Sequence, residues 1–158
     1  MLKSTEERDA FLMTKIMGYK LVYCGGHKNE AGEWKVKPAT EGYWVKADSE
    51  LITQLLKEFN NCPGQFPFTR IGGGDNIIDA DGFHPSESWH EWRAVEKTIM
   101  QNEKLWRRFV DSFGYEHDYA ASIQEYMQAD LPARIDALEA SYYDLVNEKA
   151  LEDNLKTL

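Results

Sequence analysis

Hydrophobic residues near both ends of the chain recur at three- and four-residue steps, which predicts amphipathic helices there. Ser4 and Glu7 match the capping box that opens a helix, and the apolar positions after them run up to Gly18, a residue suited to end it. In the second half of the chain Ser88 and Glu91 repeat the capping-box pattern. The sequence therefore predicts an N-terminal and a central helix with well-marked starts.

The same spacing continues in the C-terminal part of the chain. Residues 105–113 carry apolar side chains at helical steps, and Gly114 is suited to cap the end of that helix. Residues 119–127 fit a helix or a strand equally well. Asp130 is a suitable helix cap, Pro132 suits the first turn after it, and an apolar face extends over residues 135–146. We expect a closing helix here, followed by a frayed tail over residues 147–158.

Short apolar or alternating runs between the helices predict strands at residues 21–23, 34–37 and 43–45. Asp48 or Ser49 is placed to cap a helix that we expect to reach residue 59. Residues 60–82 are rich in Gly, Pro, Asn and Asp, and we expect a long loop or insertion there. Loops of this length inside a compact domain are uncommon and are often functional or disordered.

The composition is that of a folded protein and excludes several classes. With 158 residues the chain fits one domain, 1–158, and an aromatic content of 13% argues against disorder. The formal charge of −9 has the wrong sign for non-specific nucleic-acid binding. No apolar run approaches the ~20 residues of a membrane span. Two cysteines and a polar N-terminus, unlike a signal peptide, indicate a reduced, cytoplasmic protein.

Candidate metal, phosphate and cofactor motifs are all incomplete. The glycines at 72–74 lack the Lys-Ser/Thr pair of a P-loop, and the aspartates that follow them do not have the spacing of a calcium loop. Cys24 and His27 supply only half of a structural zinc site. We therefore predict no metal, no cofactor and no assigned catalytic residue.

The stretch from residue 83 to residue 97 is the richest in candidate binding side chains. Trp89 and Trp92 are three residues apart on one expected helix, so one should point into the core and the other should lie at its rim. The helix start offers free backbone amides to an anionic ligand, and Trp89 and His90 are suited to stack on a ring or to hydrogen-bond it. The plain alternative is that these residues have only structural roles.

Several segments, taken in order, resemble the phage ABA sandwich domain, a family of small, mostly uncharacterised phage and prophage proteins. Residues 11–19 are similar to the family's helix that ends in Met-Gly-Trp, and residues 43–45 match a strand. Residues 83–97 are similar to its Pro-Ser turn and Val-Glu-Lys helix, and residues 129–138 to its closing turn and helix. The chain departs from the family at 60–82 and in the helical character of 101–119. The resemblance implies helices on both faces of a small sheet and supplies no catalytic residues.

We therefore expect an α+β fold, an alpha-beta-alpha sandwich in which N-terminal, central and C-terminal helices flank a small sheet. The expected function is that of a phage-derived accessory protein acting by binding in the cytoplasm of an infected bacterial host. Its partner would be a small anionic, nucleotide-like defence signal or a host protein. The predicted ligand-binding residues are Tyr43, Trp44, His84, Ser86, Trp89, His90, Trp92 and Arg93.

Two alternatives from other function classes remain. The first is a small hydrolase or transferase that uses His84 or His90 as general base. The second is a homo-oligomeric structural or interaction protein, whose surplus aromatic side chains would be buried between subunits.

Overall fold

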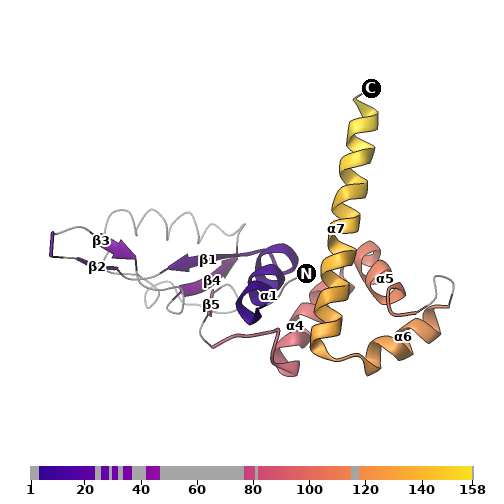
Figure 1. The fold of residues 1–158 in the computed structure, drawn as a ribbon, viewed down its shortest axis with the longest axis horizontal. Helices are drawn as coiled ribbons and strands as arrows, with labels where there is room; N and C mark the ends of the chain where they lie inside the picture. Colours follow the sequence, from indigo (N-terminus) through magenta and orange to yellow (C-terminus); the bar gives the residue numbers. More distant parts are fainter. Residues whose placement is uncertain are drawn as a thin grey trace. The chain divides into compact units, whose positions relative to one another are not determined.

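The computed structural model describes residues 4–23, 26–28, 30–31, 34–36, 42–46, 77–80, 82–114 and 118–157 (Figure 1). The chain divides into two compact units: unit 1 comprises Met1–Phe11 and Pro85–Leu158, and unit 2 comprises Leu12–His84. The chain thus leaves unit 1 after the N-terminal helix and returns to it just before the central helix. The expectation of a single domain made no allowance for this division.

A three-stranded antiparallel sheet lies in unit 2. Its strands are β1 (Tyr19–Tyr23), β4 (Gly42–Lys46) and β5 (Ile77–Asp79), in the order β1-β4-β5. Trp44 of the central strand lies opposite Leu21 on one side and Ile78 on the other. Because directly opposite residues share a face of a sheet, these three apolar residues lie on one face, and Trp44 is buried there. The strands predicted at 21–23 and 43–45 are confirmed.

The chain enters unit 2 through a short π-helical segment, η1 (Leu12–Ile16). The amide of Met17 donates to the carbonyl oxygen of Leu12 at 2.9 Å, the five-residue step that defines a π-turn. Gly18 follows with φ of +74°, a conformation that costs glycine little because it has no Cβ. The end of the N-terminal helical segment at Gly18 is therefore confirmed.

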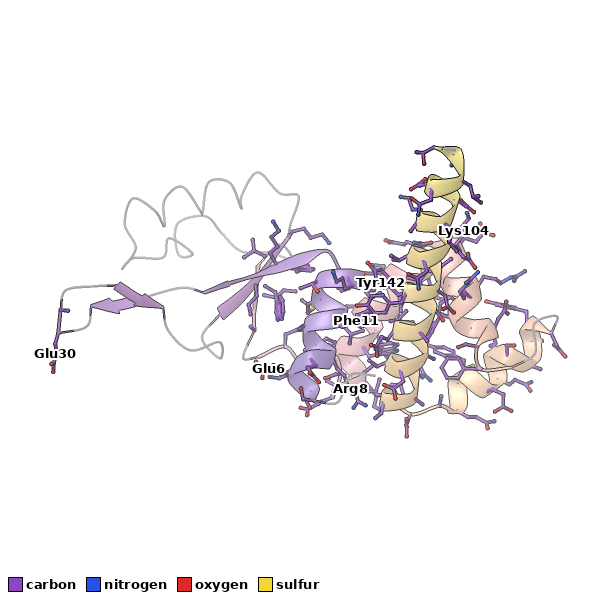
Figure 2. All side chains as sticks on the ribbon, turned by 45° about the horizontal axis from the view of Figure 1, so that its top comes forward. Glu6, Arg8, Phe11, Glu30, Lys104 and Tyr142 are labelled. Atoms are coloured by element: carbon purple, nitrogen blue, oxygen red, sulfur yellow. The ribbon has the colours of Figure 1, made fainter. Side chains whose placement is uncertain are left out.

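A hairpin of β2 (Gly26–Lys28) and β3 (Trp34–Val36) also belongs to unit 2, with Glu30 in the turn between them (Figure 2). The strand predicted at 34–37 is confirmed, but β2 was not predicted because its glycine reads as a strand breaker. The expectation of a loop over the whole of 60–82 was wrong, because the strand β5 lies inside that range. It was missed because its apolar run is only two residues long. The helix expected up to residue 59 and the glycines at 72–74 lie outside the described residues.

In unit 1 the N-terminal helix α1 (Thr5–Phe11) begins with the predicted capping box. The amide of Glu7 donates to Ser4 Oγ at 3.1 Å, and the amide of Ser4 donates to Glu7 Oε2 at 3.0 Å. The buried carboxylate of Asp9 then accepts from the amide of Ser86 at 2.9 Å, which ties α1 to the turn before the central helix.

Helices α4 (Trp89–Met100), α5 (Glu103–Asp111), α6 (Tyr119–Gln128) and α7 (Leu131–Lys156) complete unit 1. Each begins at a short polar residue whose side chain accepts from a first-turn amide; these caps are Ser88, Asn102, Asp118 and Asp130. Figure 2 shows Phe11 of α1 directed at Tyr142 of α7, and their ring centroids are 5.8 Å apart in an edge-to-face contact. The segment at 119–127, which the sequence left open between helix and strand, lies within α6 and is helical.

The core of unit 1 is rich in aromatic rings. Phe109 is fully buried, and its ring centroid lies 5.3 Å from that of Tyr126 in an edge-to-face contact. Trp106 and Phe113 contact the same tyrosine edge to face, at 5.6 Å and 5.5 Å. Tyr126 is thus the centre of a four-ring cluster between α5 and α6, which accounts for a good part of the aromatic surplus in the sequence.

Gly114 was expected to cap the helix before it, and the structure assigns it another role. Ser112 is the C-cap of α5, and Gly114 does not have positive φ. A Cβ on Gly114 would lie 2.4 Å from Ser122 Oγ and 2.7 Å from Ser122 Cα. Glycine is required here because the chain passes directly against α6.

The frayed tail expected over 147–158 is also corrected, since α7 continues unbroken to Lys156. This part of the helix is exposed, but it is rich in Ala, Leu, Glu and Lys, which have high helix propensity, and Lys156 lies 3.9 Å from Asp153 one turn away. The structure confirms the α+β class. The layering of helices on both faces of the sheet stays a prediction. Among the described helices, none has the length and apolar content to span a bilayer.

Candidate functional site

The two tryptophans at the start of α4 divide as predicted between core and rim. Trp92 is 1% exposed and Trp89 is 50% exposed. His90 and Arg93 are exposed on the same stretch of helix, whereas the side chain of Ser86 is buried in the turn before it. Trp92 and Ser86 are buried, so the exposed members of the predicted set in unit 1 are Trp89, His90 and Arg93. Contact of any of these residues with a ligand stays a prediction.

The remaining predicted residues belong to unit 2. Trp44 is buried in the sheet, as described above, and its predicted role in binding stays a prediction. His84 is half-buried at the end of the unit. Tyr43 pairs through its backbone with Val22 and Asp79. The predicted proximity of Tyr43 and Trp44 to the start of α4 stays a prediction.

A buried arginine that the sequence did not single out lies beneath Trp89. Arg134, in the first turns of α7, is 7% exposed. Its guanidinium carbon is 4.7 Å from the centroid of the Trp89 ring and 4.0 Å from that of the Tyr126 ring. Both distances fall within the range of cation–π contacts. The half-exposed Trp89 ring therefore lies on a cation, which in turn rests on the aromatic cluster of unit 1.

The guanidinium of Arg134 is also fixed by hydrogen bonds to the end of α6. Nε donates to the carbonyl oxygen of Ala129 at 3.1 Å, and Nη2 donates to that of Met127 at 3.2 Å. The last carbonyl groups of a helix have no partner within it, and a cation there also meets the negative end of the helix dipole. Arg134 thus caps α6 from the following helix, and these hydrogen bonds fix the guanidinium group over which the Trp89 ring lies.

Glu96 balances the charge of Arg134 and also binds the hydroxyl of Tyr126. Glu96 Oε1 lies 3.7 Å from Arg134 Nη1 and also accepts a hydrogen bond from the hydroxyl of Tyr126. Burial raises the pKa of Tyr126 well above its usual value, and the hydrogen bond and negative charge of Glu96 raise it further. The phenol is therefore a neutral donor at physiological pH.

A sequence signal for Arg134 did exist. Leu131, Ile135 and Leu138 form the inner stripe of α7, and Arg134 lies within that stripe at the same helical spacing. A cation on the apolar face of a helix is rarely buried unless it is paired. The position alone could have identified Arg134 as a residue with a specific partner, although not Trp89 as that partner.

Carboxylates surround the N-terminus of α4, where the sequence suggested an anion site. Asp9 accepts from the amide of Ser86, Glu87 accepts from the hydroxyl of Thr5 at 2.9 Å, and Glu91 lies in the first helical turn. These negative charges already complement the positive end of the helix dipole. The arrangement is thus better suited to an exposed aromatic and cationic contact surface than to the capture of a free anion.

The described residues contain no group of three or more His, Cys, Asp or Glu side chains able to hold a metal ion.

Comparisons of this chain with protein-family models, with curated proteins and with solved structures found no match. The case for function therefore depends on the residues of the chain itself.

Proposed function

We propose that this protein acts by binding a partner through the Trp89 surface, defined as Trp89, His90, Arg93 and Met127. The observation that carries the proposal is a half-exposed tryptophan ring that lies over a buried arginine. Met127 is 70% exposed, and its carbonyl oxygen is bonded to that same arginine. Tryptophan and arginine are the residues most enriched at binding hot spots, and large exposed apolar side chains that cluster mark interaction sites.

Contact of the Trp89 ring with a hydrogen-bonded arginine supports a role in binding rather than simple exposure. A tryptophan that is free to rotate loses conformational entropy when a partner orders it. On the Trp89 surface that cost is lowered, because the ring contacts the guanidinium of Arg134, which two hydrogen bonds hold in place. A partner gains the area of the ring without having to order it.

A host protein is the partner class that these features favour over a small nucleotide-like anion. The carboxylates of Asp9, Glu87 and Glu91 at the start of α4 would repel a phosphate group. A protein partner, in contrast, can cover the Trp89 surface and meet the exposed His90 and Arg93 at its rim. We propose that the chain is an accessory protein of phage origin that inhibits or redirects such a host protein, in keeping with its resemblance to the phage family.

Native mass spectrometry of protein purified from a bacterial host tests this proposal. We expect a retained host protein for the wild type and its loss from the Trp89→Ala/His90→Ala variant. Tyr143→Ala is the matched control, since Tyr143 is an exposed aromatic residue on α7. An adduct of a few hundred daltons in place of a protein would instead assign the surface to a small ligand. Equal retention by wild type and double variant would exclude the Trp89 surface.

The two alternative functions lead to different outcomes in the same samples. A hydrolase or transferase that depends on His84 or His90 loses turnover in the corresponding alanine variant, whereas a binding protein shows none to lose. A homo-oligomer gives a multiple of the chain mass, and its dissociation by Trp89→Ala would place the surface at a subunit interface.

A further inference from the structure

The exposed face of α4 continues from the Trp89 surface along the helix. At about 100° per residue, five exposed side chains fall within an arc of about 100°; they are Trp89, His90, Arg93, Lys97 and Met100, and together they form the α4 face. Trp89 is 50% exposed and Met100 is 55% exposed, so a large apolar side chain lies at each end of the α4 face. The two ends are about 16 Å apart along the helix axis, or about three turns.

Positive charge gathers on the α4 face, although the chain as a whole is acidic. Asp and Glu number 27 in the sequence and Lys and Arg number 18, so carboxylates would be expected on most exposed faces. The α4 face carries Arg93 and Lys97 and no carboxylate. Neither cation has an ion-pair partner among the described residues. The α4 face is therefore apolar at its ends and positively charged between them.

The carboxylates of α4 itself do not cancel this charge. Glu96 lies at the edge of the α4 face, about 20° from Trp89, where it pairs with Arg134 and binds the hydroxyl of Tyr126. Arg134 lies under the Trp89 ring and adds a positive charge at the same edge. Glu91 points about 150° away from the centre of the α4 face, toward the other side of the helix. The α4 face and its edge therefore stay positive.

Carboxylates on the neighbouring elements do not reverse the sign either. On α6, Glu125 points about 160° away from Met127, the residue of α6 that belongs to the Trp89 surface. Asp130 is engaged as the N-cap of α7, and Glu103 of α5 lines the groove between α5 and α7. The carboxylates before α4 lie at its N-terminal end, whereas the two cations of the α4 face lie about one and two turns farther along.

We infer that the α4 face binds an acidic amphipathic helix of the partner protein. The inference rests on the proposed function and names the chemistry of that partner. Apolar side chains of the partner helix would cover Trp89 and Met100, and its Asp or Glu side chains would meet Arg93 and Lys97. Trp89, Arg93 and Lys97 follow one another at four-residue steps and thus form a ridge, which fits a groove between ridges of another helix. A partner strand fits less well, because strand addition needs a free sheet edge, and α4 is a helix.

Two other occupants are disfavoured by charge. A nucleic acid would meet Arg93 and Lys97 with its phosphates, but two cations are few for phosphate binding, and the formal charge of −9 repels a polyanion. A second copy of this chain carries the same charge of −9, which opposes self-association. A partner protein needs only a local acidic stripe, since complementary charge acts where the two surfaces meet.

The test uses a fluorescent synthetic peptide with leucines at heptad positions a and d and glutamates at e and g. A matched peptide has lysines at e and g. We expect the glutamate peptide to bind the full chain more tightly than the lysine peptide, measured by fluorescence anisotropy. Its binding should weaken at least about fivefold for Arg93→Gln/Lys97→Gln and at least about tenfold for Trp89→Ala. Lys149→Gln/Lys156→Gln is the control, because it removes the same charge from an exposed part of α7.

Several results would overturn the inference. These are binding of neither peptide, equal binding of both, or equal weakening by the control pair. Tighter binding of a labelled single-stranded DNA oligonucleotide than of the glutamate peptide would assign the α4 face to a nucleic acid. A wild-type dimer in sedimentation equilibrium that Arg93→Gln/Lys97→Gln dissociates would assign it to a second copy. Circular dichroism of each variant confirms that α4 is intact.

Failure of the proposed function gives a different result from failure of this inference. A host protein that is retained equally by wild type and by Trp89→Ala/His90→Ala excludes the Trp89 surface as a whole. A host protein that is lost from that variant but kept by Arg93→Gln/Lys97→Gln leaves the Trp89 surface in place and removes only the acidic partner helix.

Discussion

Replacing Arg134 by methionine should destabilise unit 1 and release Trp89. Methionine has a similar length but cannot donate to the carbonyl oxygens of Met127 and Ala129, and hydrogen bonds from a charged donor contribute about 1.5–3 kcal/mol each. Loss of the stack on the half-exposed Trp89 ring removes about 0.5–1 kcal/mol more. Because the freed carbonyl groups and Glu96 regain some contact with water, we expect a net loss of about 3 kcal/mol.

Urea denaturation followed by far-ultraviolet circular dichroism measures this loss, since helices dominate that signal. Arg93→Met is the matched control, because Arg93 is exposed on α4, and it should unfold like the wild type. Arg134→Lys should fall between the two, since lysine keeps the charge but cannot donate to both carbonyl oxygens as a planar fork does. A loss below about 1 kcal/mol for Arg134→Met would refute the claim that the arginine holds the α6–α7 corner and the Trp89 ring.

Three further predictions concern other parts of unit 1. Because the folded-state pKa of Tyr126 is raised, its contribution to stability is complete below about pH 10, the pKa of a free tyrosine, and is lost as the pH rises further. Tyr126→Phe should remove this pH dependence from the unfolding free energy but leave the absorbance titration of the other tyrosines unchanged. Gly114→Ala should cost about 1–3 kcal/mol through its clash with α6. The control is Gly82→Ala in unit 2, where a Cβ would have no atom of the described residues within 4 Å; it should leave thermal unfolding unchanged. Asp9→Ala leaves a buried amide before α4 unpaired, so it should lower the unfolding free energy by about 1–3 kcal/mol, and an unchanged midpoint would mean that α1 is not held by this bond.

Local signals in the sequence predicted local structure well. Ser4, Ser88 and Asp130 were all identified as helix caps, and each accepts from a first-turn amide in the structure. A cap needs only residues within one turn of each other, so its geometry follows from the sequence. The stop at Gly18 depends on one backbone torsion and was predictable for the same reason.

Features that depend on residues far apart in sequence were not predictable. β5 has two apolar residues, and it is a strand because Ile78 meets Trp44 across the sheet. Gly114 was identified as a helix stop, but its role depends on how closely Ser122 of the next helix approaches. Periodicity reports which face of an element is apolar; it does not report which other element covers that face.

The candidate site shows the same division between local and distant information. Spacing indicated that one of Trp89 and Trp92 would be exposed, and α4 begins at the first of them. Placement of Arg134 under Trp89 depends on the corner between α6 and α7, which brings together residues 45 positions apart. The sequence thus identified the exposed ring but not the cation that holds it in place.

The central claim, that the Trp89 surface contacts a partner, is tested most directly by photo-crosslinking in a bacterial host. Benzoylphenylalanine placed at position 90, beside Trp89, should give a discrete crosslinked adduct with one partner on illumination. The same group at position 143 on α7 should not give that adduct, and Trp89→Ala should abolish it. An adduct that forms equally from both positions, or that survives loss of Trp89, would contradict the account.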